Sequence, residues 1–190
     1  MKFTSDPSAG TLVCNAAQGS RDLTLLKERA YQAVLMFTWI RFDAPLPWTK
    51  LTLDTWFAHA IHGVDFRNDY QYSYCCLTGG IIAIQSKGLA VLTKSIAPWD
   101  SVRWLASLFV HEARHNEGYL HTCTTGDRAG QNDNTIAELG SWGVQYYFNL
   151  WLGTHSDPAL VPESDRKWAH HEADSMVSTF FCNQPPLSTP

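Results

Sequence analysis

Apolar residues recur every three to four positions over several long segments of the chain, which is the spacing of one face of an α-helix. A shorter run with the same spacing predicts a further helix that Gly63 would end. Pro45 and Pro47 separate this short helix from the one before it, because proline cannot continue a helix. The predicted helices cover about residues 22–41, 53–61, 102–115, 135–152 and 163–181.

Between about residues 70 and 94 the pattern changes to short apolar runs that are separated by glycine-containing turns. Such runs are rich in aromatic and branched apolar residues, and this composition favours strands. The predicted strands are 70–77, 80–85 and 89–93, with turns at 78–80 and 86–88. Short turns join neighbouring strands in opposite directions, so the expected sheet is a small antiparallel meander.

These elements together predict an α+β fold that is mainly helical, with the small antiparallel meander placed next to the helix at 102–115. A chain of 190 residues is most simply one domain, so the prediction is a single domain over residues 1–190. Residues 1–20 are rich in Ser, Gly and Ala, and residues 183–190 are rich in proline, so both ends are expected to be flexible.

Composition excludes several classes of protein. Hydrophobic residues make up 45% of the chain and charged residues only 17%, so the chain is not intrinsically disordered. The net charge is −4 and no Lys/Arg cluster occurs, which argues against a nucleic-acid partner because nothing would neutralise phosphates. No run of about 18 apolar residues is found, so no membrane span is expected.

The 5 cysteines have no Cys-x-x-Cys spacing, so a structural zinc site made of four thiolates is not expected. Their odd number favours reduced thiols, although two disulfides with one free thiol also fit the count. Met1–Asp6 contains no apolar core of a signal peptide. The sequence as given therefore predicts a cytoplasmic protein, and a secreted protein whose signal peptide has been removed would look the same.

One stretch of the chain carries recognisable chemistry. It reads His111-Glu112-Ala113-Arg114-His115-Asn116-Glu117-Gly118-Tyr119-Leu120-His121, or H-E-x-x-H-x-x-G-x-x-H. On a helix, residues four apart leave the same face, so His111 and His115 can both bind one Zn²⁺ through neutral imidazoles. Glu112 lies beside that pair and can act as the general base that takes a proton from the attacking water. Composition alone would produce this pattern about once in thirty thousand such chains.

The neighbouring residues fit a helix that is buried and ends at a defined point. No Gly or Pro occurs from Val102 to His115, and Asp100 or Ser101 could cap the helix start. Apolar residues on more than one side of the helix indicate burial. Gly118 can end the helix because glycine tolerates a left-handed turn.

The motif resembles the zincin metallopeptidases, and its eleven-residue pattern is similar to the extended metzincin signature. The resemblance implies a single Zn²⁺ held by His111, His115 and His121, with Glu112 as the general base and Gly118 as the turn before the third ligand. It also implies that a strand near the motif helix binds an extended peptide through its backbone. The chain has Glu117 where the family usually has an apolar residue.

Other residues compete for roles at this site. Glu138 follows His115 by 23 positions, close to the layout of thermolysin-like and aminopeptidase-like zincins, in which a second helix supplies a glutamate ligand. Glu138 is therefore an alternative third or fourth ligand, or an acceptor for the N–H of a ligating imidazole. Tyr146 or Tyr147 could donate a hydrogen bond to an oxyanion or support a ligand. Cys123 is a further candidate ligand, since thiolates also bind zinc.

The sequence therefore predicts a zinc-dependent hydrolase, and more specifically a metallopeptidase that acts on peptide or protein substrates. The alternative is a non-catalytic metal-binding or interaction domain, in which four protein ligands close the zinc site. A non-peptidase hydrolase is a third reading, because peptide deformylases also contain H-E-x-x-H, but their cysteine-containing motif is not evident here. The sequence does not define the substrate, the cleavage specificity or the oligomeric state.

Overall fold

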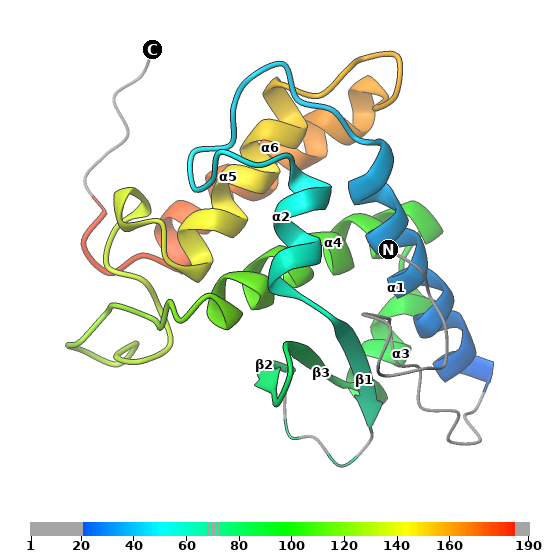
Figure 1. The fold of residues 1–190 in the computed structure, drawn as a ribbon, viewed down its shortest axis with the longest axis horizontal. Helices are drawn as coiled ribbons and strands as arrows, with labels where there is room; N and C mark the ends of the chain where they lie inside the picture. Colours follow the sequence, from blue (N-terminus) through cyan, green and yellow to red (C-terminus); the bar gives the residue numbers. More distant parts are fainter. Residues whose placement is uncertain (1–20, 68, 70, 72, 185–190) are drawn as a thin grey trace. The chain divides into compact units, whose positions relative to one another are not determined.

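The computed structural model describes residues 21–67, 69, 71 and 73–184 (Figure 1). The predicted flexible segment 1–20 and most of the predicted flexible tail, residues 185–190, lie outside the described residues. The described residues pack into two compact units. The first unit comprises those within 1–39 and 53–117, and the second comprises those within 40–52 and 118–190. Whether the whole chain behaves as one domain stays a prediction.

Four helices build the first unit: α1 (Arg21–Trp39), α2 (Leu53–Ala60), α3 (Ser86–Ser95) and α4 (Pro98–Asn116). Helix α1 packs against the other three, and α4 contacts α2 and α3 as well. Three of these helices meet through aromatic rings in the core. The ring centroids of Phe37 and Phe57 lie 4.7 Å apart, and those of Phe57 and Phe109 lie 6.4 Å apart. The sequence predictions for α1, α2 and α4 are confirmed to within a few residues.

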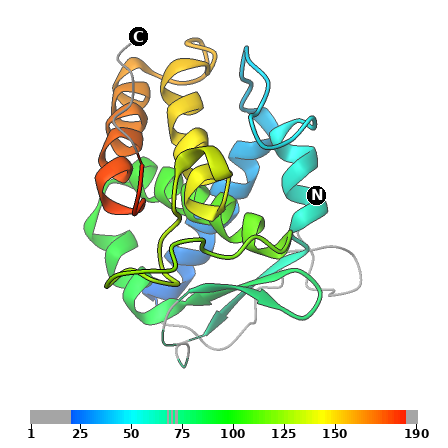
Figure 2. The same cartoon turned by 90° about the vertical axis from the view of Figure 1, so that its left-hand side faces the viewer.

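The sheet of the first unit has three strands, β1 (Gly63–Arg67), β2 (Tyr74–Leu77) and β3 (Ile81–Gln85), in the order β1-β3-β2. The pair β2–β3 is antiparallel, as predicted, but β1 pairs with β3 in parallel. Figure 2 shows the three strands side by side. The mainly helical α+β fold is confirmed, whereas the antiparallel meander is wrong, because the third strand precedes the hairpin and runs parallel to its neighbour.

The predicted strand at 89–93 is part of helix α3 instead. The predicted turn at 86–88 is the first turn of that helix, and the side chain of Gln85 caps it by accepting a hydrogen bond of 2.8 Å from the N–H of Gly88. Ala90 and Thr93 are buried, whereas Val91 is 63% exposed. Burial at a spacing of three is helical, whereas a strand would have placed Val91 and Thr93 on the same face. A short apolar run does not by itself distinguish the two periods.

Helix α4 begins with Pro98 in its first turn, where the missing N–H costs no helical hydrogen bond. Its N-cap residue is Ala97, not Asp100 or Ser101, and no side chain caps the helix start. Most of the side chains from Ser101 to Arg114 are buried, so α4 is a core helix, as predicted. It contacts both β2 and β3.

The second unit is built on α5 (Ser141–Thr154) and α6 (Glu163–Thr179), which lie side by side (Figures 1 and 2). Their backbones approach closely at Gly153, where a Cβ atom would lie 2.9 Å from both the Arg166 oxygen and the His170 nitrogen. A cluster of buried apolar residues joins the two helices to the segments that flank them, and it contains Ile136, Tyr146, Ala173, Met176 and Phe181. The segment 40–52 joins this unit through a bond of 2.9 Å from the Asp43 N–H to the His155 oxygen.

The predicted helix at 135–152 is interrupted at its start. A single 3₁₀ turn, η2 (Ile136–Glu138), is followed by Leu139 in the left-handed conformation with φ of +52°, and α5 begins only at Ser141. Glu138 is therefore not on the helix that the apolar spacing predicted. The segment 122–133 forms a loop. None of the described helices is both long enough and apolar enough to cross a membrane.

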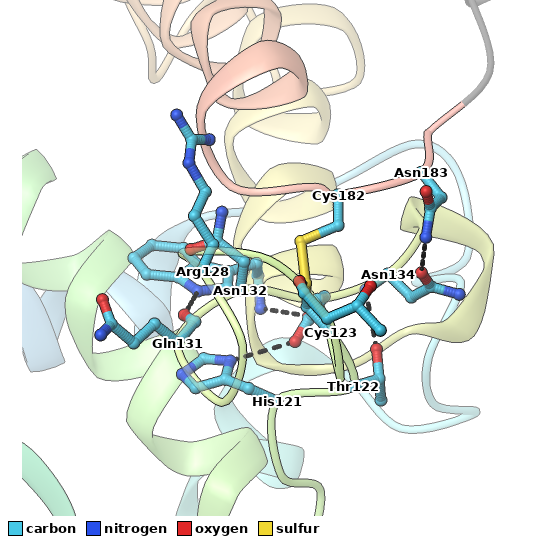
Figure 3. Close-up of a disulfide and its surroundings, with 12 residues drawn as sticks. His121, Thr122, Cys123, Arg128, Gln131, Asn132, Asn134, Cys182 and Asn183 are labelled. Carbon is cyan, nitrogen blue, oxygen red and sulfur yellow. Dashed lines mark hydrogen bonds and ion pairs between the residues drawn. A yellow bond between two sulfur atoms is a disulfide. The ribbon is translucent and has the colours of Figure 1, made fainter.

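A disulfide connects Cys123 in this loop to Cys182, just beyond α6 (Figure 3). The two residues are 59 positions apart in sequence, and their Cα atoms lie 6.1 Å apart. For this pair the expectation of reduced thiols is wrong. The sequence offered no means of pairing them, because connectivity depends on which cysteines the fold brings together.

We expect this disulfide to stabilise the second unit by restricting the unfolded chain. For a loop of this length, chain entropy alone corresponds to about 4 kcal/mol, with measured values of about 2–5 kcal/mol. Urea unfolding with and without a reducing agent measures the difference, after mass spectrometry has confirmed reduction. The double variant Cys123→Ser/Cys182→Ser is the control and should unfold like the reduced protein in both buffers. Equal stability of oxidised wild type and double variant would contradict the prediction.

Candidate metal centre

The last two turns of α4 carry the first two predicted ligands. His111 is buried, His115 is partly buried, and their ring centroids lie 4.8 Å apart with the planes at 78° to each other. This proximity follows from their spacing, because residues four apart stack on one helical face. Glu112 is only 4% exposed and lies in the same turn. Helix α4 therefore holds two imidazoles and one carboxylate on a rigid, buried element.

Helix α4 ends as the motif predicts. The N–H of Glu117 still bonds to the oxygens of Ala113 and Arg114, at 3.3 and 3.2 Å. Gly118 then adopts φ of +91°, a left-handed conformation that other residues rarely accept. A Cβ atom at Gly118 would meet no neighbouring atom within 4 Å. The backbone conformation, and not a lack of space, is therefore what requires glycine here.

Each carboxylate oxygen of Glu117 is hydrogen-bonded to another side chain. Its Oε1 accepts a hydrogen bond of 2.9 Å from Trp56 Nε1 on α2, and its Oε2 lies 2.8 Å from Arg114 Nη1. Arg114 thus anchors a nearby carboxylate. Next to it, the side chain of Asn116 donates to the oxygen of Ala60. These contacts hold the end of α4 against α2, and they explain an acidic residue where the metzincin pattern usually has an apolar one.

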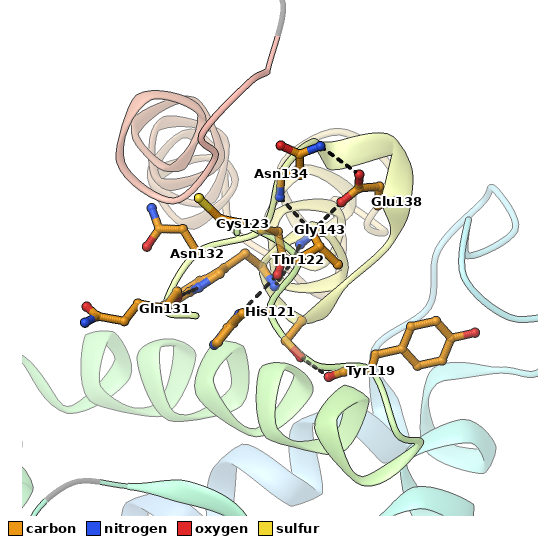
Figure 4. A network of polar contacts seen from close by, with 12 residues as sticks. Tyr119, His121, Thr122, Cys123, Gln131, Asn132, Asn134, Glu138 and Gly143 are labelled. Atoms are coloured by element: carbon orange, nitrogen blue, oxygen red, sulfur yellow. Dashed lines mark hydrogen bonds and ion pairs between the residues drawn. The ribbon is translucent and has the colours of Figure 1, made fainter. Parts of the chain in front are cut away.

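His121 lies on the loop after α4, and two contacts orient its ring (Figure 4). His121 Nδ1 lies 3.1 Å from Asp133 Oδ1. The ring also stacks on Trp142, with centroids 5.9 Å apart and planes at 17°. Trp142 in turn stacks on Phe180, at 3.7 Å and 8°. The third histidine is therefore held by the second unit through a hydrogen bond and a column of aromatic rings.

Asp133 is fully buried and makes several contacts through its carboxylate. Its Oδ2 accepts from the backbone N–H groups of Trp142 and Gly143, at 2.8 and 3.2 Å. Asp133 thus caps α5, although it lies eight residues before Ser141, where that helix begins. Sequence reasoning missed the contact between Asp133 and His121. No signal in the sequence marks that bond, because only the folded loop brings the two residues together.

The motif brings its three histidines close together. One ligand atom from each of His111, His115 and His121 lies within 4.8 Å of the others, which is close enough to hold a metal ion. Ligand atoms about 2.05 Å from a tetrahedral zinc lie about 3.4 Å apart, so the three nitrogens would have to move closer together to bind one ion. The identity of the metal does not follow from this distance.

Glu138 is exposed and is not a member of this three-histidine group. It accepts hydrogen bonds from the Thr122 hydroxyl and from Asn134 Nδ2, the latter at 3.1 Å (Figure 4). Partial burial raises the pKa of Glu138, but the hydrogen bonds from Thr122 and Asn134 outweigh it, so the pKa is lowered overall. These bonds stabilise a charged carboxylate beside Thr122. Its role as a third or fourth ligand stays a prediction.

The remaining candidates have structural contacts. Tyr146 is buried in the core of the second unit, with its ring 5.3 Å from Tyr147 and 6.4 Å from Phe181 between centroids. Burial raises the pKa of Tyr146, and the nearby Tyr147 and Asp174 add to this. An oxyanion role for Tyr146 or Tyr147 stays a prediction. The sulfur of Cys123 is bonded to Cys182, so it does not act as a thiolate ligand in this state.

Comparisons of the chain with protein-family models, with curated proteins and with solved structures find no match. The resemblance to zincins therefore rests on the motif alone.

We expect Glu117→Leu, which introduces the residue type usual in metzincins, to destabilise the protein by about 1–3 kcal/mol, because Trp56 and Arg114 each lose a hydrogen bond to a charged acceptor. Thermal or urea unfolding measures the loss. The control is Glu28→Leu at an exposed position of α1, which should change stability by less than about 0.5 kcal/mol. If both variants unfold together with wild type, Glu117 does not hold α4 in place.

Proposed function

We propose that this protein is a zinc-dependent hydrolase, and more specifically a metallopeptidase. The observation that carries the proposal is the three-histidine group beside a buried glutamate that follows the first histidine directly. Three protein ligands with one open position are typical of catalytic zinc sites, whereas structural sites are closed by four. Imidazole nitrogens suit Zn²⁺ but also Cu, Fe and Ni, so the choice of zinc rests on the motif.

In this proposal His111, His115 and His121 hold the metal and Glu112 handles protons. The bound zinc would act as a Lewis acid that polarises the scissile carbonyl and lowers the pKa of a water towards about 7. Glu112 would accept the proton of the attacking water and pass it to the leaving amine. Its placement on the buried helix α4 fixes its distance from His111 and His115, and such preorganisation is what general-base catalysis requires.

The arrangement of the sheet supports a peptide as the substrate. Strand β2 stands at one edge of the sheet, and it packs against α4, the helix that carries the motif. An edge strand has unpaired backbone groups that can bind an extended peptide by strand addition. In zincins, which the motif resembles, an edge strand next to the active-site helix has this task.

Metal content tests the ligand assignment. We expect purified wild type to hold about one equivalent of zinc per chain, His121→Ala to lose it and Glu138→Ala to keep it, since Glu138 already has partners in Thr122 and Asn134. Inductively coupled plasma mass spectrometry after dialysis gives the equivalents. Loss in both variants would favour the non-catalytic alternative, a closed site with four ligands. Wild type that takes up no zinc on titration would overturn the proposal.

Glu112→Gln tests catalysis apart from metal binding. It should retain zinc but cleave a mixture of unstructured peptides about 10²- to 10⁴-fold more slowly, because the amide cannot accept the proton of water. Mass spectrometry of the peptide products gives the rates. Glu117→Gln is the matched control, being the same substitution within the same motif, and should keep most of the activity. Full activity in Glu112→Gln would rule out the assigned mechanism.

A further inference from the structure

We propose that Asp133 is a positioning residue: it sets the tautomer and orientation of His121, so that Nε2 is the nitrogen available to a metal ion. This inference rests on the proposed function for the identity of the ligand that His121 would hold. The contact between Asp133 and His121 stands without it and can be tested in the metal-free protein.

The tautomer follows from which atoms can donate. A carboxylate has no proton to donate, so the short contact between Asp133 Oδ1 and His121 Nδ1 requires that Nδ1 carries the hydrogen. In the neutral imidazole the other nitrogen, Nε2, then carries no hydrogen and keeps its lone pair. Only an unprotonated ring nitrogen can bind a metal. Asp133 therefore selects the tautomer that a metal ligand needs.

The carboxylate itself is held firmly. Besides the two N–H groups of α5 on Oδ2, the backbone of Asp133 is bonded on both sides. Its N–H donates to the Phe180 oxygen at 3.1 Å, and its oxygen accepts from the Cys182 N–H at 3.0 Å. The neighbouring disulfide restricts the same loop (Figure 3). The ring of Trp142, which stacks on His121, restricts it as well. His121 thus takes its direction from a residue with little freedom to move.

The Asp133 carboxylate lies against Gly140, where a larger residue would leave no room for it. A Cβ atom there would lie 2.5 Å from Asp133 Oδ2 and 2.7 Å from its Cγ, although the φ of −68° suits any residue. Gly140→Ala would therefore displace the Asp133 side chain without changing any charge or hydrogen-bonding group. Gly153→Ala is its matched control, because the added methyl would press on the backbone of α6 and not on Asp133.

The variant Asp133→Asn tests the tautomer of His121 directly. The two backbone N–H groups of α5 require an oxygen acceptor, so the amide oxygen should face them and the amide NH₂ should face His121. Nδ1 would then have to accept a hydrogen bond, and the proton would move to Nε2. The variant keeps the shape of the residue but reverses the tautomer.

The test is ¹⁵N NMR of the histidine rings in the metal-free, full-length protein at a pH where His121 is neutral, together with zinc affinity by competition with a chelator. We expect the Nδ1–H form of His121 in wild type and in Gly153→Ala, and the Nε2–H form in Asp133→Asn. Zinc affinity should fall about 10- to 100-fold in Asp133→Asn and Gly140→Ala, and change less than about threefold in Gly153→Ala.

The outcomes separate the two proposals. An Nε2–H tautomer in wild type, which needs no variant to fold, would overturn the role of Asp133, as would equal losses of affinity in Gly140→Ala and Gly153→Ala. A reversed tautomer in Asp133→Asn combined with no zinc uptake by wild type would support the positioning of His121 and overturn the proposed function.

Discussion

A single buried carboxylate holds much of the second unit in place. The Asp133 carboxylate accepts hydrogen bonds from two backbone N–H groups in the first turn of α5 and contacts His121. Its backbone is bonded to Phe180 and Cys182 at the end of α6. A buried charge is tolerated only when hydrogen bonds replace its water, and here every contact also joins separate segments of the chain. The helix cap, the end of α6 and the direction of one histidine therefore depend on the same group.

The histidines of the motif are held in two different ways. His111 and His115 are placed by the period of α4 alone, whose end is tied to α2 by Glu117. His121 follows a glycine turn, and its orientation comes from Asp133 and the stacked ring of Trp142. The backbone of a helix holds neighbouring side chains at a fixed spacing, whereas a loop residue must be oriented by packing and hydrogen bonds. Ordering a loop in advance lowers the entropy lost when a ligand binds.

Small residues in the second unit permit these contacts. Gly140 leaves room for the Asp133 carboxylate, and Gly153 lets the backbones of α5 and α6 approach closely. The disulfide closes the same region covalently, and it joins the loop that carries His121 to the end of α6. These polar and covalent links act in addition to the apolar contacts between α5, α6 and the segments that flank them.

Residue spacing and local backbone preferences were sufficient to predict part of this structure. The sequence by itself determined helices α1, α2, α4 and α6, and the pairing of β2 with β3. It also determined the glycine turn at 118 and the proximity of His111 to His115. Each of these features depends on side-chain periodicity or on the backbone preference of one residue. Only the tertiary structure decided that 89–93 is helical, that β1 joins the sheet in parallel, that Cys123 pairs with Cys182 and that Asp133 contacts His121. Three of these features are contacts between segments that are distant in sequence. The helix at 89–93 depends instead on which of its side chains the rest of the fold buries. The local spacing of apolar residues encodes neither.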